Sequence, residues 1–137
     1  MTTTRFAQVF LAIMGLAFCK VGIEALLNPQ AVLQQVGIVL DNASALSSMR
    51  AVYGGMHFVF GLLCFWSVMR QQTPGLWLVV LYTTGFVVGR TISMGADGTP
   101  NTFVLTWLAT ETFSLAASAT LLMLLRQPAR VSAMASR

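Results

Sequence analysis

The chain has 137 residues, of which 56% are hydrophobic and 9% are charged, whereas ordinary soluble domains carry about 25% charged residues. Eight basic and four acidic side chains are too few to cover a soluble domain of this length, so the composition predicts a protein whose outer solvent is lipid. The formal charge of +4 does not indicate nucleic-acid binding, because the arginines lie beside apolar runs and form no basic stripe.

Four apolar runs have the length of about 20 residues that a helix needs to cross the hydrocarbon core of a bilayer. In chain order, they cover residues 6–27, 49–69, 74–92 and 102–125. Proline or turn-rich segments separate them, at Asn28-Pro29, at residues 70–73 and at residues 95–101, and such segments end helices. The sequence therefore predicts an all-α membrane protein, a bundle of four transmembrane helices in one domain, residues 1–137.

The connection between the first two runs, residues 28–48, is the longest. Within it, residues 29–40 form a short amphipathic stretch, with Val32, Leu33 and Val36 at helical spacing. Two interpretations of this stretch are open: a helix lying in the membrane interface, or a helical linker packed over the bundle.

The basic residues outside the four runs fall on one side of the predicted bundle. They are Arg5, Arg70, Arg126, Arg130 and Arg137. The first and third connections carry Asp41 and Asp97 but no lysine or arginine. Because positively charged flanks stay in the cytoplasm, both termini are predicted to be cytoplasmic, including a tail at residues 126–137, and the first and third connections are predicted to lie outside.

Six ionisable residues lie inside the predicted spans, where a charged group is costly and marks a candidate functional site. They are Lys20, Glu24, Arg50, His57, Arg90 and Glu111. In the predicted orientation, all six fall in the outer half of the bundle. Lys20 and Glu24 are four residues apart and share a helix face. Arg50, Tyr53 and His57 also share one face at helical spacing. Because lipid cannot solvate such faces, they are expected to point inward and form a polar pocket.

This pocket is predicted to bind a small molecule or a lipid head group. Arg50 and Arg90 would hold its polar group, and Glu111 would neutralise them when the pocket is empty. Tyr53 and His57 would orient the ligand. The other candidate ligand-binding residues are Lys20, Glu24 and Asp97. An anion or zwitterion is the favoured ligand if the side chain of Asp97 turns away from the pocket.

Two other functions are consistent with the same residues. The protein could be a membrane enzyme or redox accessory acting on a lipid-soluble substrate such as a quinone, with a cofactor that the sequence leaves unknown. The sequence contains no recognisable catalytic motif and no histidine-based metal site. It could instead be a structural subunit of a homo-oligomer or larger membrane complex, in which Arg50, Arg90 and Glu111 pair closely with no cavity between them. In each case, Gly85 and Gly89 form a GxxxG motif that favours close helix packing.

Several short motifs together resemble a known family. They are R-A-x-Y-G-G from Arg50, G-R-x-x-S from Gly89, D-G-x-P from Asp97 to Pro100, and Glu111 in the last run. The family comprises small bacterial inner-membrane proteins of unknown function and is similar to the DoxX-like four-helix membrane proteins. The resemblance covers most of the chain. It implies a multi-pass protein of the bacterial inner membrane and supplies no reaction and no functional residue.

Overall fold

The computed structural model describes residues 2–126, so the predicted tail beyond them, with Arg130 and Arg137, lies outside the described residues. The elements are α1 (Thr2–Leu27), α2 (Pro29–Gln34), α3 (Ala43–Met49), the π-helical segment η1 (Arg50–Gly55), α4 (Met56–Met69), α5 (Gln72–Asp97) and α6 (Thr102–Arg126). Together α3, η1 and α4 form one continuous helix, and this helix, α1, α5 and α6 are each long and apolar enough to cross a membrane. The predicted all-α bundle of four spanning helices is confirmed for this part of the chain.

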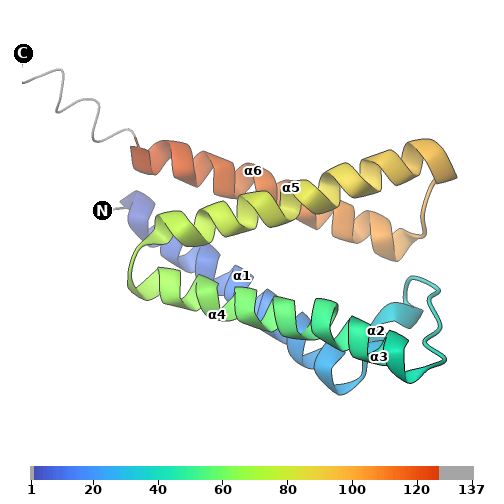
Figure 1. Ribbon diagram of the computed structural model, residues 1–137. Coiled ribbons are helices and arrows are strands. Elements are labelled where there is room, and N and C mark those ends of the chain that lie inside the picture. The colour runs from blue at the N-terminus through green and yellow to red at the C-terminus, as the bar shows by residue number, and fades with distance from the viewer. Residues whose placement is uncertain (1, 127–137) are drawn as a thin grey trace, which may run out of the picture.

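The four helices form two pairs that diverge along the bundle. Figure 1 shows α1 beside α4 and α5 beside α6, and these are the most extensive helix contacts in the molecule. The pairs lie close together at the end where α4 is joined to α5, which we call the narrow end. They separate toward the end where α3 begins and α5 is joined to α6, which we call the wide end. This divergence leaves room between the pairs.

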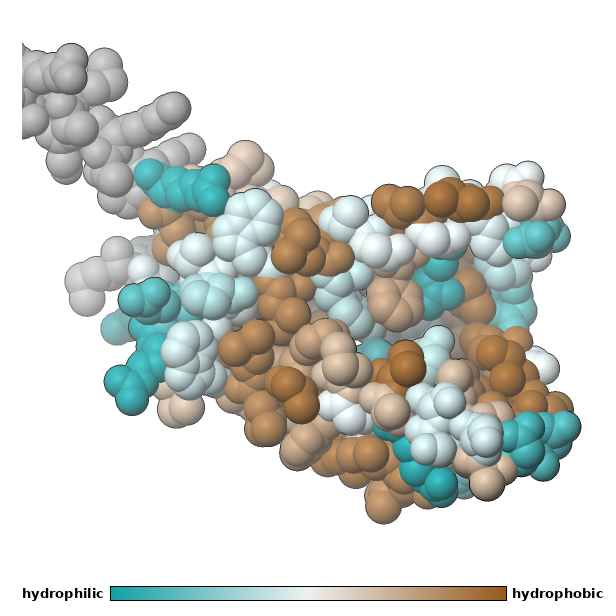
Figure 2. Space-filling model, in the orientation of Figure 1, coloured by the Kyte–Doolittle hydropathy of each residue, from teal (hydrophilic) through white to brown (hydrophobic). Residues whose placement is uncertain are grey.

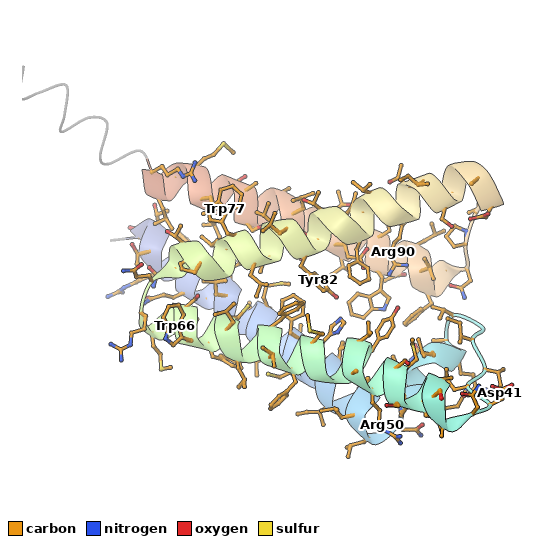
Figure 3. The ribbon with its side chains drawn as sticks, viewed as in Figure 1. Asp41, Arg50, Trp66, Trp77, Tyr82 and Arg90 are labelled. Carbon is orange, nitrogen blue, oxygen red and sulfur yellow. The ribbon has the colours of Figure 1, made fainter. Side chains whose placement is uncertain are left out.

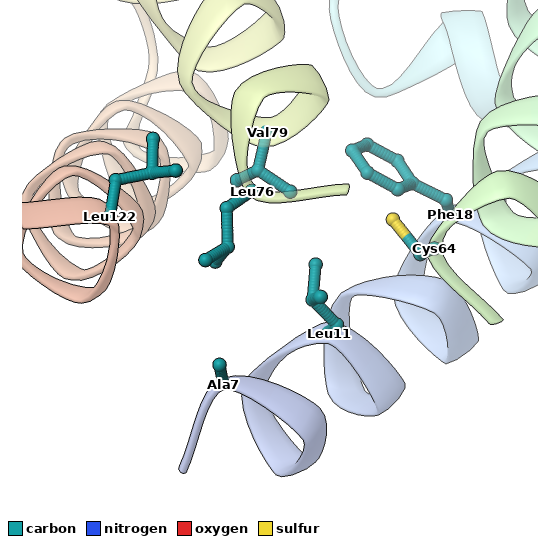
Figure 4. Close-up of a cluster of buried hydrophobic side chains, with 7 residues drawn as sticks. All are labelled: Ala7, Leu11, Phe18, Cys64, Leu76, Val79 and Leu122. Atoms are coloured by element: carbon teal, nitrogen blue, oxygen red, sulfur yellow. The ribbon is translucent and has the colours of Figure 1, made fainter. Parts of the chain in front are cut away.

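The hydrophobic core lies toward the narrow end and joins all four helices (Figure 4). Its buried side chains are Ala7, Leu11, Phe18, Cys64, Leu76, Val79 and Leu122. Most of the remaining apolar side chains point outward, and only 22% to 28% of the residues in the spanning windows are buried. Figure 2 shows this outer surface as a hydrophobic middle with hydrophilic groups toward both ends. Such a surface requires lipid as its solvent.

Small residues let α1 and the second spanning helix approach each other closely. A Cβ atom added at Gly22 would lie 2.6 Å from the backbone nitrogen of Phe58, and one added at Gly54 would lie 2.7 Å from Cγ of Leu26. Gly61 is similarly enclosed, by Cys19 and by the backbone of α1. Gly15, which also contacts Gly61, lies seven residues before Gly22 on α1, and Gly54 lies seven residues before Gly61 on the second helix. The glycines of each helix therefore follow one contact face.

The second and third spanning helices extend further toward the wide end than the sequence predicted. The second begins at Ala43, where the side chain of Asn42 caps α3 by accepting a hydrogen bond of 2.8 Å from the backbone of Ala45. The third continues to Asp97, whose carboxylate accepts a hydrogen bond of 2.9 Å from the hydroxyl of Ser93 within the same helix. It ends at Gly98, which has a φ of +95°, a conformation that favours glycine. The loop before α6 is therefore short.

The amphipathic stretch of the first connection packs over the bundle in this structure. α2 begins at Pro29 behind the cap residue Asn28, and both Pro29 and Leu33 are buried. The side-chain amide of Asn101, at the start of α6, donates a hydrogen bond of 3.0 Å to the backbone carbonyl of Gln35. This bond ties the residue that follows α2 to the start of α6, so the first connection reaches from one helix pair to the other at the wide end.

Candidate functional site

A cavity of about 680 Å³ lies between the two helix pairs toward the wide end. Its walls come from α1, α5 and α6, α2 covers one side, and Tyr53 and His57 contribute from the second spanning helix. Figure 2 shows the hollow between the pairs, with hydrophilic surface inside it. The volume falls in the range of about 300–1,000 Å³ that is typical of small-molecule sites.

An ion pair between α5 and α6 forms the strongest polar feature of the cavity. Nε of Arg90 donates a hydrogen bond of 2.8 Å to Oε2 of Glu111, and Nη2 of Arg90 donates one of 3.1 Å to Oε1. The Glu111 side chain is only 7% exposed and that of Arg90 is 23% exposed. The guanidinium also lies 5.6 Å from the centre of the Phe86 ring. Both charged residues line the cavity, so the pair is held at its wall and accessible from inside it.

A second polar group is built around the single histidine of the chain. Nε2 of His57 lies 2.6 Å from the hydroxyl of Tyr82, and Nδ1 lies 3.3 Å from the backbone carbonyl of Val52. Because a carbonyl only accepts, Nδ1 carries the proton, so Nε2 accepts the hydrogen bond that the tyrosine donates. Tyr53 stacks on the imidazole, with ring centroids 5.7 Å apart and planes inclined by 10°. The histidine is therefore fixed in position and tautomer.

Lys20 and Glu24 form the predicted pair on α1, at 2.7 Å. Their side chains are 70% and 51% exposed, yet both residues contribute to the cavity lining. They therefore lie at its rim.

The structure brings six of the eight predicted site residues to the cavity. They are Lys20, Glu24, Tyr53, His57, Arg90 and Glu111. Arg50 and Asp97 do not line it. Asp97 is exposed near the end of α5 and bonds to Ser93 of its own helix.

The expectation that Arg50 shares a face with His57 is wrong. Arg50 is exposed and donates a hydrogen bond of 3.1 Å to the carbonyl of Leu26, near the end of α1. Figure 3 shows it outside the bundle, away from Arg90 and Tyr82. Arg50 begins a π-helical segment, and a π turn takes about one residue more than an α turn. A face counted at 3.6 residues per turn therefore does not continue through the segment.

The packing role expected for Gly85 and Gly89 is also wrong. A Cβ atom added at either residue would meet nothing within 4 Å, and both residues line the cavity. The motif faces open space because α5 turns this side toward the gap between the pairs.

Sequence reasoning missed Tyr82 as a cavity residue. A signal for it was present, because Tyr82, Phe86 and Arg90 are four residues apart in turn and all line the cavity. A search for aromatic residues in phase with the buried arginine would have found it.

Over residues 2–126, fold and surface together define a multi-pass membrane protein with four spanning helices. Residues 6–125 match the family described as Domain of unknown function (DUF4345), and the chain belongs to this family. It matches no curated protein and no solved structure significantly.

Proposed function

We propose that the protein binds a small, lipid-soluble molecule in the cavity, with the polar group of that molecule anchored at Arg90. The observation that carries this proposal is the paired Arg90 and Glu111 on the wall of a cavity of about 680 Å³. The same cavity is lined by aromatic side chains, including Phe86 and Trp107. Apolar walls with a few convergent polar groups are typical of ligand sites.

Arg90 retains hydrogen-bonding capacity that its partner does not use. A guanidinium has five N–H donors, and within residues 2–126 Arg90 donates to Glu111 alone, through two bonds. The remaining donors are available to oxygen atoms of a ligand. A ligand acceptor can therefore bind without breaking the ion pair.

The charge of the cavity favours an uncharged or zwitterionic ligand. Arg90 and Lys20 are balanced by their partners Glu111 and Glu24. With Arg50 outside the cavity, the excess of positive charge that would favour an anion is absent from its described lining. Adding a net charge to a balanced site of low dielectric constant costs free energy. Carbonyl and hydroxyl oxygens satisfy the free donors without this cost.

The cavity supports ligand binding over a purely structural role. A structural subunit was expected to bury its charges in close contact with no space between them. Here the ion pair adjoins a cavity that crosses from one helix pair to the other. A role as a membrane enzyme or redox accessory, and the likeness to DoxX-like proteins, stay predictions. A cofactor absorbance in the purified protein would support them.

Native mass spectrometry of gently purified protein tests the proposal. We expect a molecule of defined mass to be retained by the wild type and lost from the double variant Arg90→Met/Glu111→Leu. Replacing both charges with apolar groups of similar size avoids leaving one charge unpaired, so the variant should remain folded.

Asp97→Asn is the matched control, because Asp97 was a candidate and lies outside the cavity lining. It should retain the molecule. Equal retention by the double variant and the wild type would refute the anchoring role of the pair, and a wild type that retains nothing, even after addition of lipid-soluble compounds, would refute the proposed function.

A further inference from the structure

Two glycines expose bare helix backbone to the cavity. Gly85 and Gly89 lie one turn apart on α5, and the space beside each is open for at least 4 Å. Glycine weakens a helix interior relative to alanine. The glycines of α1 and the second spanning helix compensate by letting backbones approach, but no neighbouring helix occupies the space beside Gly85 or Gly89. Their effect is to keep this part of the cavity wide and flat.

Aromatic rings border the glycine surface. On α5, the rings of Tyr82 and Phe86 lie with centroids 4.7 Å apart, and the Arg90 guanidinium continues this row beyond Phe86. On α6, Phe103 and Trp107 contribute to the cavity wall as a pair with centroids 6.2 Å apart. Ring faces and bare backbone together make a wall that matches the flat face of another ring system.

A hydroxyl on the wall of the same cavity is free to bond a ligand. Ser114 is 4% exposed and lines the cavity, one turn from Glu111, and its hydroxyl makes no hydrogen bond with any residue from 2 to 126. The other buried hydroxyls beside it behave differently: those of Thr83 and Ser118 donate to carbonyls of their own helices, each at 2.7 Å. Among residues 2–126 the fully buried side-chain oxygen without a partner is that of Ser67, so the Ser114 hydroxyl is reached from the cavity that it lines. It can therefore donate to an oxygen atom of a bound ligand.

We infer that the ligand is an uncharged compound with a flat ring system that lies on Gly85 and Gly89, with oxygen atoms bonded by Arg90 and Ser114. This inference rests on the proposed function and adds the class of ligand. The two glycines determine specificity by shape, since a side chain at either position would occupy the space of the ring. A flexible acyl chain has no such requirement, because it can bend around a methyl group.

The test compares alanine substitutions at glycines of one helix. Gly85→Ala and Gly89→Ala place a methyl group in the cavity, whereas Gly95→Ala, the matched control, places one in open space outside the cavity lining. None of the three creates a clash, so all three should keep or raise the thermal midpoint. Only the first two should weaken binding of 9-fluorenone, a flat uncharged ketone, by about tenfold, the equivalent of losing one good contact.

Binding can be read from Trp107 in a Trp66→Phe/Trp77→Phe background, because the chain has three tryptophans and Trp107 lines the cavity. Figure 3 shows Trp66 and Trp77 near the narrow end. Dodecan-1-ol serves as the flexible probe and should bind to the glycine variants as it does to the wild type. Ser114→Ala should weaken fluorenone binding several-fold, and Ser118→Ala, whose hydroxyl is used within its own helix, should not.

The outcomes separate this inference from the proposed function. If the glycine variants bind fluorenone as well as Gly95→Ala does, or lose dodecan-1-ol to the same extent as fluorenone, the flat-ring inference is overturned while binding in the cavity stands. If the wild type binds neither probe and retains no molecule in mass spectrometry, the proposed function itself falls.

Discussion

The ion pair between Arg90 and Glu111 places two charges where water is largely excluded. Breaking such a pair by removing one partner leaves an uncompensated buried charge and costs about 3–5 kcal/mol. The pair on α1 differs, because Lys20 and Glu24 are mostly exposed, and exposed pairs contribute about 0–1 kcal/mol. Both pairs lie within the predicted spans, but they differ in energy because of their burial.

This difference gives a prediction for stability. Glu111→Gln should lower the free energy of unfolding by about 3 kcal/mol, since Arg90 keeps its charge without a carboxylate. Glu24→Gln should change it by less than about 1 kcal/mol. Unfolding in mixed micelles of increasing SDS content measures both. Equal losses for the two variants would show that the buried pair has no special weight.

The histidine offers a prediction that does not depend on a ligand. His57 should be neutral with its proton on Nδ1, since that nitrogen faces the Val52 carbonyl and Nε2 accepts from Tyr82. The chain has one histidine, so ¹⁵N NMR of labelled protein reports on this ring alone. Tyr82→Phe should shift the Nε2 resonance and leave Nδ1 nearly unchanged. A proton found on Nε2 would contradict the hydrogen-bond direction described above.

At the scale of helices, the two kinds of glycine show what a sequence can and cannot predict. Hydropathy predicted the four spanning helices that residues 2–126 contain, although not all of their ends, because each must be apolar over the bilayer thickness. The same pattern does not say which small residues meet another helix. The contact uses Gly22, Gly54 and Gly61, whereas Gly85 and Gly89 face the cavity. The difference arises only when α5 is placed against its neighbours.

This assignment predicts opposite effects of the same substitution. Gly61→Ala should destabilise the bundle by about 1–3 kcal/mol or more, the usual cost of overpacking, because its new methyl group would overlap Cys19 and the α1 backbone. Gly95→Ala should be neutral or stabilising by up to about 1 kcal/mol. Thermal midpoints in detergent provide the comparison. A thermal midpoint for Gly61→Ala equal to that of the wild type would show that α1 and α4 do not pack as described.

The π-helical segment explains why the sequence prediction placed Arg50 in the pocket incorrectly. Six of eight candidate residues were placed in the cavity by assuming regular α-helices with polar faces inward. Arg50 lies outside the cavity because the helix is not a regular α-helix at η1. Asp97 lies outside it because α5 continues beyond the end that the sequence predicted. Hydropathy predicts neither a π turn nor the extension of a helix by a few residues, so only the structure shows them.

At the scale of the whole molecule, the sequence predicted the four spanning helices found in residues 2–126 and the clustering of most of the polar residues. It did not predict how the helices are arranged around the cavity. The cavity exists because the two helix pairs diverge toward the wide end (Figure 1). Divergence depends on close glycine contacts within the α1–α4 pair and on the core at the narrow end. These contacts depend on how the helices pack against one another, so they cannot be predicted from the distribution of apolar residues along the sequence.

The orientation in the membrane remains a prediction of the charge distribution. Arg5, Arg70 and Arg126 mark the narrow end as cytoplasmic, which places the cavity in the half of the bundle facing away from the cytoplasm. Reporter fusions at the C-terminus test this in bacteria: a fluorescent protein that folds in the cytoplasm should be bright, and alkaline phosphatase should be inactive. The reverse pattern would place the cavity on the cytoplasmic side.

An experimental density map of the protein purified directly from its membrane tests the central claim most directly. We predict density for a non-protein molecule between the helix pairs, lying on α5 at Gly85 and Gly89 and touching Arg90, which remains paired with Glu111. A map in which the pairs close over the gap, or in which only water occupies it after soaking with lipid-soluble ring compounds, would contradict the account.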